Sequence, residues 1–356
     1  MSTRLTARWL APVTTPPIEN GALLVDDDGR IAAIGPAASV PVPDDAACID
    51  LGEAILLPGL VNAHAHPELG MMRGLLENLP FHDWIPALKR IKRETPLTGA
   101  DFQVAARAAC IESLAAGITT MGATEDSDAA LVALGEAGMR GVVYREVFGP
   151  APGQADEAIA ELREKLAAMR SRATDLVRVG ASPHAPYTVS DRLFEGVARL
   201  AAEEGCPIAV HIAESEAEHR LVRAGAGPFA ERLVRRGIAT QTRAASPVAL
   251  LERTGILRLR PLLIHAVRVD GDDIRRIAGA GAPVAHCPVA NARLGNGIAP
   301  LTELLDAGVT VALGTDSVAA NNRMDLLEEA RCAQILQRAR AGSPTLLPPD
   351  RLLRLA

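Results

Sequence analysis

The chain has 356 residues, of which 48% are hydrophobic and 22% are charged, as in a globular protein with a large core in one or two domains. Its net charge is −6, its pI is about 5.8, it has no run of Lys or Arg, and only 3% of its residues are aromatic. These properties argue against binding to nucleic acid or to an anionic membrane surface. No apolar run approaches the roughly 20 residues that span a bilayer.

The cysteines and the N-terminus indicate a cytoplasmic protein. Five cysteines are dispersed along the chain with no Cys-x-x-Cys pair, which argues against a disulfide framework. Residues 1–17 lack the continuous apolar segment of a signal peptide. We therefore expect a reducing, cytoplasmic environment.

Residues 1–54 have the pattern of a small β subdomain. Residues 22–25 and 31–35 are short apolar strand candidates, and the turn sequence Asp-Asp-Asp-Gly lies between them. Proline-rich connections follow. We expect the main body of the protein to occupy residues 55–356.

From residue 55 onward, short apolar strands alternate with amphipathic helices. Eight strands over about 260 residues match a (β/α)8 barrel in count and size. A doubly wound open sheet is the main alternative. The barrel is favoured because polar residues recur at the carboxyl ends of the strands, where a barrel collects its active site. We expect the strands to end near His66, Met121, Tyr144, His184, His211, His265, His286 and Asp316.

The first of these strands ends in two histidines. Residues 55–61 are mostly apolar, as in a parallel strand covered on both faces. Because side chains repeat with period two along a strand, His64 and His66 point the same way and could hold one metal ion. The alternative is two unrelated polar residues at a strand end.

Other strand ends supply the remaining groups for a hydrolytic metal site. Three imidazoles and a carboxylate suit zinc and leave room for a water molecule, whose pKa the metal lowers toward neutrality. A carboxylate that is not a ligand can then carry protons, and another histidine can orient the water or polarise the substrate. Singly, each residue could instead be a hydrogen-bonded core histidine or a helix-capping aspartate. The groups are His64, His66, His211 and Asp316 around the metal, Glu214 as proton carrier, and His265.

Two further regions lie near the predicted site. His286 ends the seventh strand but is followed by Cys287-Pro288, so a structural role is expected for it. The first βα connection, residues 68–99, is long and carries several apolar side chains, among them Phe81 and Trp84. Such a loop over a barrel mouth suits a lid or a pocket wall, and an ordinary packed excursion is the alternative.

The motifs resemble the amidohydrolase superfamily, in its adenosine-type deaminase and chlorohydrolase branch. The resemblance implies one zinc, with iron as the alternative, bound by His64, His66, His211 and Asp316. It also implies that Glu214 is the proton shuttle and that His265 and Asp316 position the attacking water. No lysine ends a strand, which disfavours the two-metal branch. The motifs are PGLVNAHAH (58–66), SPHAPYTVS (182–190), VHIAESEAE (210–218), LIHAV (263–267), HCPVANARLGNGIAP (286–300) and LGTDSVAANNRMDLLEEAR (313–331).

Within this branch the chain is most similar to methylthioadenosine/S-adenosylhomocysteine deaminases and aminodeoxyfutalosine deaminases. That similarity implies that Glu94 holds the ribose hydroxyls, Arg145 the 5′ end, and His184 the base. In the family, a helix and strands that complete the small β domain follow the equivalent of the last residue, Ala356. They are absent here, so we expect the C-terminal half of the small domain to be missing from a truncated sequence.

The resemblance implies hydrolytic deamination of a 6-aminopurine nucleoside, with release of ammonia. The nucleoside would be adenosine, methylthioadenosine, S-adenosylhomocysteine or aminodeoxyfutalosine. A guanine, cytosine or triazine aminohydrolase or chlorohydrolase would use the same site. A non-catalytic metal-binding or ligand-binding barrel is an alternative of another class, but it would not need Glu214. The sequence does not decide whether the protein forms a homo-oligomer.

Overall fold

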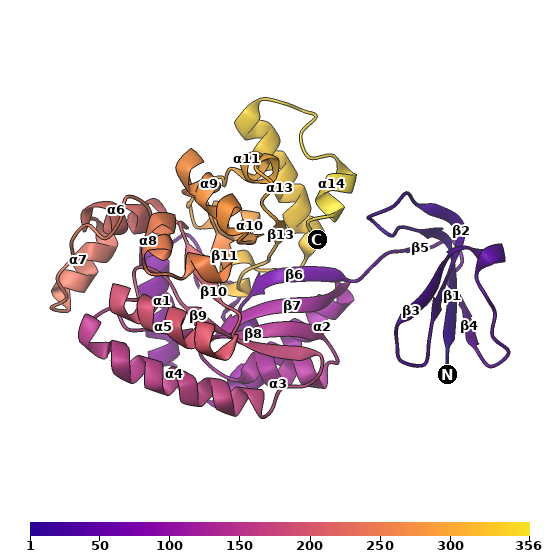
Figure 1. The fold of residues 1–356 in the computed structure, drawn as a ribbon, viewed down its shortest axis with the longest axis horizontal. Helices are drawn as coiled ribbons and strands as arrows, with labels where there is room; N and C mark the ends of the chain where they lie inside the picture. The colour runs from indigo at the N-terminus through magenta and orange to yellow at the C-terminus, as the bar shows by residue number, and fades with distance from the viewer. The chain divides into compact units, whose positions relative to one another are not determined.

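The computed structural model describes residues 1–356 and divides into two compact units. The first comprises Met1–Gly59 together with Pro349–Arg354, and the second comprises Leu60–Pro348 together with Leu355–Ala356. Figure 1 shows the elements of both units along the chain.

A five-stranded sheet forms the first unit. Its order is β3-β2-β1-β4, and β5 also pairs with β1. The strands predicted at residues 22–25 and 31–35 lie within β2 and β3, and the Asp26 side chain closes the turn between them by accepting from the backbone of Asp28 and Arg30. Because β5 pairs with β1, this unit includes the residues just after 54. The strands are β1 (Thr3–Leu10), β2 (Ile18–Val25), β3 (Ile31–Pro36), β4 (Ala47–Asp50) and β5 (Ile55–Leu56).

Eight parallel strands form the body of the second unit and confirm the predicted barrel. They are arranged as two four-stranded sheets in chain order, β6-β7-β8-β9 and β10-β11-β12-β13. Buried apolar residues dominate most of these strands, as expected for strands covered on both faces. The strands are β6 (Leu60–Ala65), β7 (Ile118–Glu125), β8 (Arg140–Val147), β9 (Val177–Pro183), β10 (Ala209–Ile212), β11 (Leu262–His265), β12 (Val284–His286) and β13 (Val311–Leu313).

The two sheets are joined on both sides, which we call seams, by backbone contacts and, at the second seam, by side-chain hydrogen bonds as well. A bridge between Ala181 and Ile208 connects β9 to the approach to β10. On the other side, the Asn62 side chain accepts from the Thr315 amide at 3.0 Å and donates to the Thr315 hydroxyl at 2.8 Å. The Asp316 amide donates to the carbonyl of His64 at 2.9 Å. The second seam therefore places two of the predicted metal ligands side by side.

Helices follow the strands and pack outside the barrel, as α3, α4 and α5 do beside β7–β9 (Figure 1). The predicted alternation of strands with helices is confirmed along this unit. None of the helices combines the length and hydropathy that a membrane crossing requires. The helices after the first are α2 (Gly99–Ala115), α3 (Ala129–Glu136), α4 (Ala155–Arg170), α5 (Asp191–Glu204), α6 (Glu216–Ala224), α7 (Pro228–Arg235), α8 (Pro247–Arg253), α9 (Gly271–Ala280), α10 (Pro288–Arg293), α11 (Leu301–Asp306), α12 (Val318–Asn321), α13 (Leu326–Ala341) and α14 (Pro349–Leu353).

The long connection after β6 contains a helix that forms a wall of the barrel mouth. It begins with a 3-10 turn, η2 (Pro67–Met72), and continues into α1 (Phe81–Glu94). The Phe81 ring packs edge-on against Tyr187 and Phe229, with ring centroids 5.9 and 6.0 Å away. These contacts fix the inner face of α1, so the predicted pocket wall is present.

Candidate metal centre and active site

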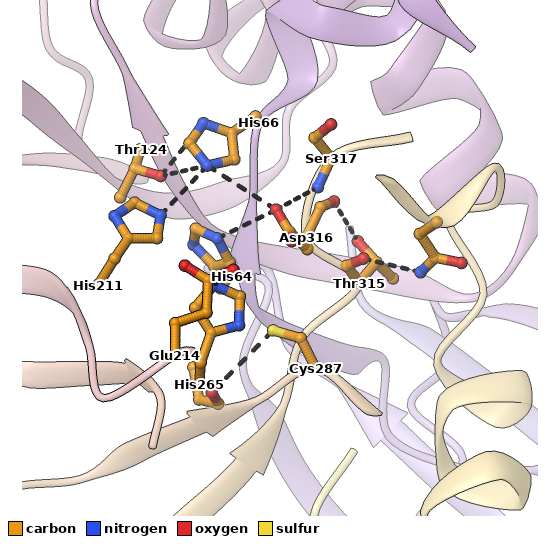
Figure 2. A network of polar contacts seen from close by, with 12 residues as sticks. His64, His66, Thr124, His211, Glu214, His265, Cys287, Thr315, Asp316 and Ser317 are labelled. Carbon is orange, nitrogen blue, oxygen red and sulfur yellow. Dashed lines mark hydrogen bonds and ion pairs between the residues drawn. The ribbon is translucent and has the colours of Figure 1, made fainter. Parts of the chain in front are cut away.

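The strand ends bring all six predicted metal and catalytic residues together at one end of the barrel. Figure 2 shows the imidazoles and the carboxylates converging on a common space. All but His66 are buried, and the His66 side chain is only 12% exposed. The residues are His64 and His66 from β6 and its end, His211 from β10, Glu214 just beyond it, His265 from β11 and Asp316 after β13.

His64 and Asp316 are neighbours across the barrel seam. The Asp316 Oδ1 atom lies 3.5 Å from Nε2 of His64 and 3.8 Å from Nε2 of His66. Gly314 leaves room for the His64 ring, because a Cβ there would come within 3.0 Å of the His64 Cβ. Neither ring nitrogen of His64 has a hydrogen-bond partner, although the ring is fully buried.

His66 and His211 face each other from opposite sheets. Their Nε2 atoms lie 3.3 Å apart, and their rings are nearly parallel. The Nδ1 atom of His211 donates to the carbonyl of His184 at 3.0 Å. This bond leaves the Nε2 of His211 deprotonated and available as a ligand.

These groups fit a divalent metal ion. Burial lowers the pKa of His64, His66 and His211, which favours the neutral rings that metal ligands must be. Possible ligand atoms of two triads, His64–His66–His211 and His64–His265–Asp316, each lie within 4.8 Å of one another. A buried imidazole with both nitrogens unpaired is costly unless something binds it. Bound metal would satisfy His64, and the N and O donors suit zinc.

Glu214 is held in a tight turn beside the metal-ligand cluster. The Glu218 carboxylate accepts from the backbone amides of Ala213 and Glu214, at 2.8 and 2.9 Å, and Ser215 caps the helix that carries Glu218. Burial raises the pKa of Glu214 well above its usual value, and the charges of Asp316 and Glu218 raise it further. This shift favours the protonated carboxylic acid, as a proton carrier requires.

The Glu214 carboxylate has two side-chain neighbours. The Nδ2 atom of Asn296 donates to its Oε1 at 3.1 Å, and the Nε2 of His265 lies 3.6 Å from the same oxygen. Both neighbours are buried. They orient one carboxylate oxygen.

Three residues of the site have left-handed backbone conformations. The φ angles are 50° at Ala213, 76° at His265 and 58° at Asp316. Non-glycine residues in this region carry a cost of about 1–3 kcal/mol each, which persists only where the surrounding structure imposes it. Such conformations cluster at functional sites, as they do here.

A cavity of about 360 Å³ opens onto the cluster. The imidazole of His184 lies between Phe148 and His211, with ring centroids 5.0 and 4.8 Å away, and its Nδ1 is 2.7 Å from the Thr188 hydroxyl. The structure thus brings His184 to the cavity, and its contact with the base remains a prediction. Other lining residues are Glu68, Leu69, Phe81, Trp84, Ile85, Leu88, Lys89, Lys92, Arg93, Asp126, Glu146, Tyr187 and Leu294.

Glu94 and Arg145 do not line this cavity, contrary to the sequence-based assignment. Glu94 lies two residues past Lys92, about 200° around the helix, and is exposed beside Arg93. Arg145 alternates with the inward-facing residues of β8, so its guanidinium points to the outer layer and lies 3.6 Å from Asp128.

Residues that the sequence reasoning did not select do line the cavity. Glu146 occupies the inward position next to Arg145, and Lys92 pairs with both carboxylate oxygens of Asp126 at 2.9 Å. The alternation of β8 could have indicated Glu146, since Tyr144 and Phe148 share its parity. Asn296 lies within the 286–300 motif, but nothing in that motif shows that its partner is Glu214. No sequence signal marks the Lys92–Asp126 pair, because its two members are distant along the chain.

Known proteins are similar to this chain in sequence and in fold. The sequence profile of the amidohydrolase family matches residues 55–356. A 5-methylthioadenosine/S-adenosylhomocysteine deaminase of Moorella thermoacetica is 32% identical over 352 residues, which cover 98% of this chain and 77% of that protein.

Two solved structures superpose on almost the whole chain. An adenosine deaminase from Xanthomonas campestris with bound zinc has a TM-score of 0.83 at 28% identity, covering 99% of this chain and 78% of that chain. An atrazine chlorohydrolase from Arthrobacter aurescens, complexed with zinc, has a TM-score of 0.83 at 25% identity, covering 99% and 81%. Taken with the profile match and the relative above 30% identity, these likenesses show that the chain is an enzyme belonging to the amidohydrolase family.

Proposed function

We propose that the protein is a metal-dependent deaminase that hydrolyses the 6-amino group of a purine nucleoside and releases ammonia. One arrangement supports this function most directly. Glu214 is a buried carboxyl group with a raised pKa. It lines the cavity beside the predicted His/Asp metal ligands. A proton carrier next to a metal site is what hydrolytic displacement of an amine requires.

His64, His66, His211 and Asp316 would hold one divalent ion, which we assign as zinc. Zinc accompanies two similar solved enzymes, and three imidazoles with one carboxylate are common zinc ligands. When bound, the ion supplies the Lewis acidity that activates a water molecule for attack on C6 of the purine.

Glu214 transfers protons during the reaction, and His265 orients the attacking water. The carboxylic acid of Glu214 delivers a proton to the ring nitrogen next to C6, and the resulting carboxylate takes a proton from the attacking water and passes it to the departing amine. Glu214 then regains a proton from the new C6 hydroxyl as the carbonyl forms. Ammonia leaves as the carbon–nitrogen bond breaks. His265, buried with a lowered pKa, is neutral and orients the attacking water. His184 is placed to contact the base.

A substrate panel tests the proposal against its main competitor. We expect ammonia release from at least one of adenosine, 5′-methylthioadenosine, S-adenosylhomocysteine and aminodeoxyfutalosine by zinc-loaded enzyme. Atrazine, guanine and cytosine form the second arm, because the similarity to the atrazine chlorohydrolase favours that chemistry. Turnover confined to the second arm, with full metal content, would refute the nucleoside assignment.

Asn296 should set the orientation of the Glu214 carboxylate. Replacing Asn296 by Leu removes the donor at 3.1 Å and should lower kcat by about tenfold to a hundredfold with little change in KM. Asn296→Ser, which retains a hydroxyl donor, should recover part of the loss. Zinc content measured alongside the kinetics should stay at the wild-type value. An unchanged kcat for Asn296→Leu would remove this residue from the proton path.

A further inference from the structure

Glu329 is a buried carboxyl group that the proposed mechanism does not use. It lies on α13 and is only 1% exposed. Its hydrogen bonds come from two amide groups, and no cation is paired with it. An apolar side chain at this position would avoid the cost of taking a carboxyl group out of water, so the contacts that Glu329 makes call for an explanation.

The two contacts of Glu329 lead to the segments that follow two neighbouring barrel strands. Its Oε2 atom accepts from the backbone amide of Val289 at 3.1 Å, in α10, the helix after β12. Its Oε1 atom accepts from the Nδ2 atom of Asn321, in α12, the helix after β13. Because β12 and β13 are paired, Glu329 joins the carboxyl ends of two adjacent strands.

Asn321 extends this link to the residue before a predicted metal ligand. Its Nδ2 atom carries two hydrogens, and it also donates to the carbonyl of Thr315 at 2.7 Å. The amide and the hydroxyl of Thr315 are already held by Asn62. Three polar groups of Thr315 are thus bound by two buried side chains, so the backbone of Thr315 cannot rotate without breaking one of these bonds.

The peptide bond between Thr315 and Asp316 helps to set the direction of the Asp316 carboxylate. Asp316 has a φ angle of 58°, in the left-handed region, which persists only where the surrounding structure imposes it. The amide of Ser317 donates to Oδ1 of Asp316 at 2.6 Å, and the same oxygen lies 3.5 Å from Nε2 of His64. Figure 2 shows Thr315, Asp316 and Ser317 beside the imidazoles.

We propose that Glu329 is a positioning residue, which acts through Asn321 and Thr315 to hold the carboxylate of Asp316 in the direction of the metal. The inference rests on the metal site of the proposed function. Groups that hold a ligand in place commonly contribute about tenfold to a hundredfold to metal affinity. Without Glu329, the Nδ2 group of Asn321 loses one of its two acceptors and can turn away from the carbonyl of Thr315.

Zinc affinity, measured by competition with a chromophoric chelator, tests the proposal. Glu329→Leu should raise the zinc Kd by about tenfold to a hundredfold, and Glu329→Gln, which keeps one acceptor oxygen, should raise it less. The control is Gln337→Leu on the same helix. Gln337 is equally buried and donates to the carbonyl of Ala299 at 2.8 Å, so its loss should lower the Tm and leave the zinc Kd unchanged. An unchanged Kd in Glu329→Leu, or an equal rise in Gln337→Leu, would overturn the proposal.

A double-mutant cycle tests the path through Asn321, and it stands in for Glu329→Leu if that variant does not fold. Asn321→Ala removes the next link, so it should also raise the zinc Kd by about tenfold to a hundredfold. Adding Glu329→Gln to Asn321→Ala should cause no further loss, because both changes break the same path. Losses that multiply in the double variant would show that Glu329 does not act through Asn321.

Cobalt(II) in place of zinc reports the geometry of the ligands directly. The visible absorption of the cobalt-loaded protein should change in Glu329→Gln and match the wild type in Gln337→Leu. Neither measurement needs turnover, so both are independent of the substrate. A wild-type protein that binds no zinc would refute the metal site itself. Zinc binding that is insensitive to Glu329→Gln and to Asn321→Ala would refute the positioning role alone.

Discussion

Replacing Glu214 by Gln should abolish deamination while the metal site remains occupied. Gln has the shape of the protonated side chain and can accept the contact from Asn296, but it cannot give up or take a proton. General acid–base catalysis contributes about 10²- to 10⁴-fold, so kcat should fall by that factor. Zinc content, measured by atomic absorption, should stay at the wild-type ratio, because Glu214 is not among the predicted ligands.

A matched replacement in the same segment controls for charge. Glu216 lies two residues further on, is exposed at the start of α6, and has no contact with the cavity. Glu216→Gln should therefore retain wild-type kcat. If Glu214→Gln turned over nucleoside at the wild-type rate, another group would have to move the protons.

Removal of the metal should abolish activity and lower the Tm together. The predicted ligands come from β6 and its end, from β10 and from the segment just after β13, so a bound ion would tie both sheets of the barrel. An ion that binds only the folded chain stabilises it by about 4 kcal/mol at a free concentration 1,000 times its Kd. For a domain of this size that corresponds to a Tm shift of roughly 10 °C. Chelation followed by scanning calorimetry measures the shift, and added zinc should restore the Tm and the activity.

The Asp316→Asn variant shows whether the fall in Tm comes from loss of the bound metal or from another effect of the chelator on the protein. The amide cannot supply a charged ligand, so this variant should bind zinc weakly and melt at nearly the same temperature with and without chelator. The control matters because Asp316 also makes backbone contacts at the seam, which the variant retains. A wild-type Tm unaffected by complete metal removal would contradict a role for these residues as ligands.

The metal and catalytic residues could be predicted from the sequence because each ends a buried strand. A parallel barrel brings the carboxyl ends of its strands to one face, so the residues at those ends meet whatever the details of packing. His64, His66, His211, His265 and Asp316 follow that rule, and the structure brings them together. The same pattern, polar residues at the carboxyl ends of successive buried strands, predicted both the fold class and the position of the site.

The substrate-facing residues could not be predicted in this way. Arg145 and Glu146 are adjacent, and the alternation of β8, which continues to Val147, places Glu146 inward. The prediction ended that strand at Tyr144, which left the orientation of both residues undefined. Glu94 depends on the rotation of α1, which packing of Phe81 on Tyr187 fixes. Such orientations follow from tertiary contacts, which one sequence does not reveal.

The seam between β6 and β13 has a consequence for the order of folding. Its partners are separated by about 250 residues, for Asn62 and Thr315 are 253 positions apart. During synthesis the N-terminal half-barrel must wait, with its first strand unpaired on one side, until nearly the whole chain has emerged. The ligand set is likewise split between early and late segments. Binding of the proposed metal by all four predicted ligands would therefore require this seam to have closed.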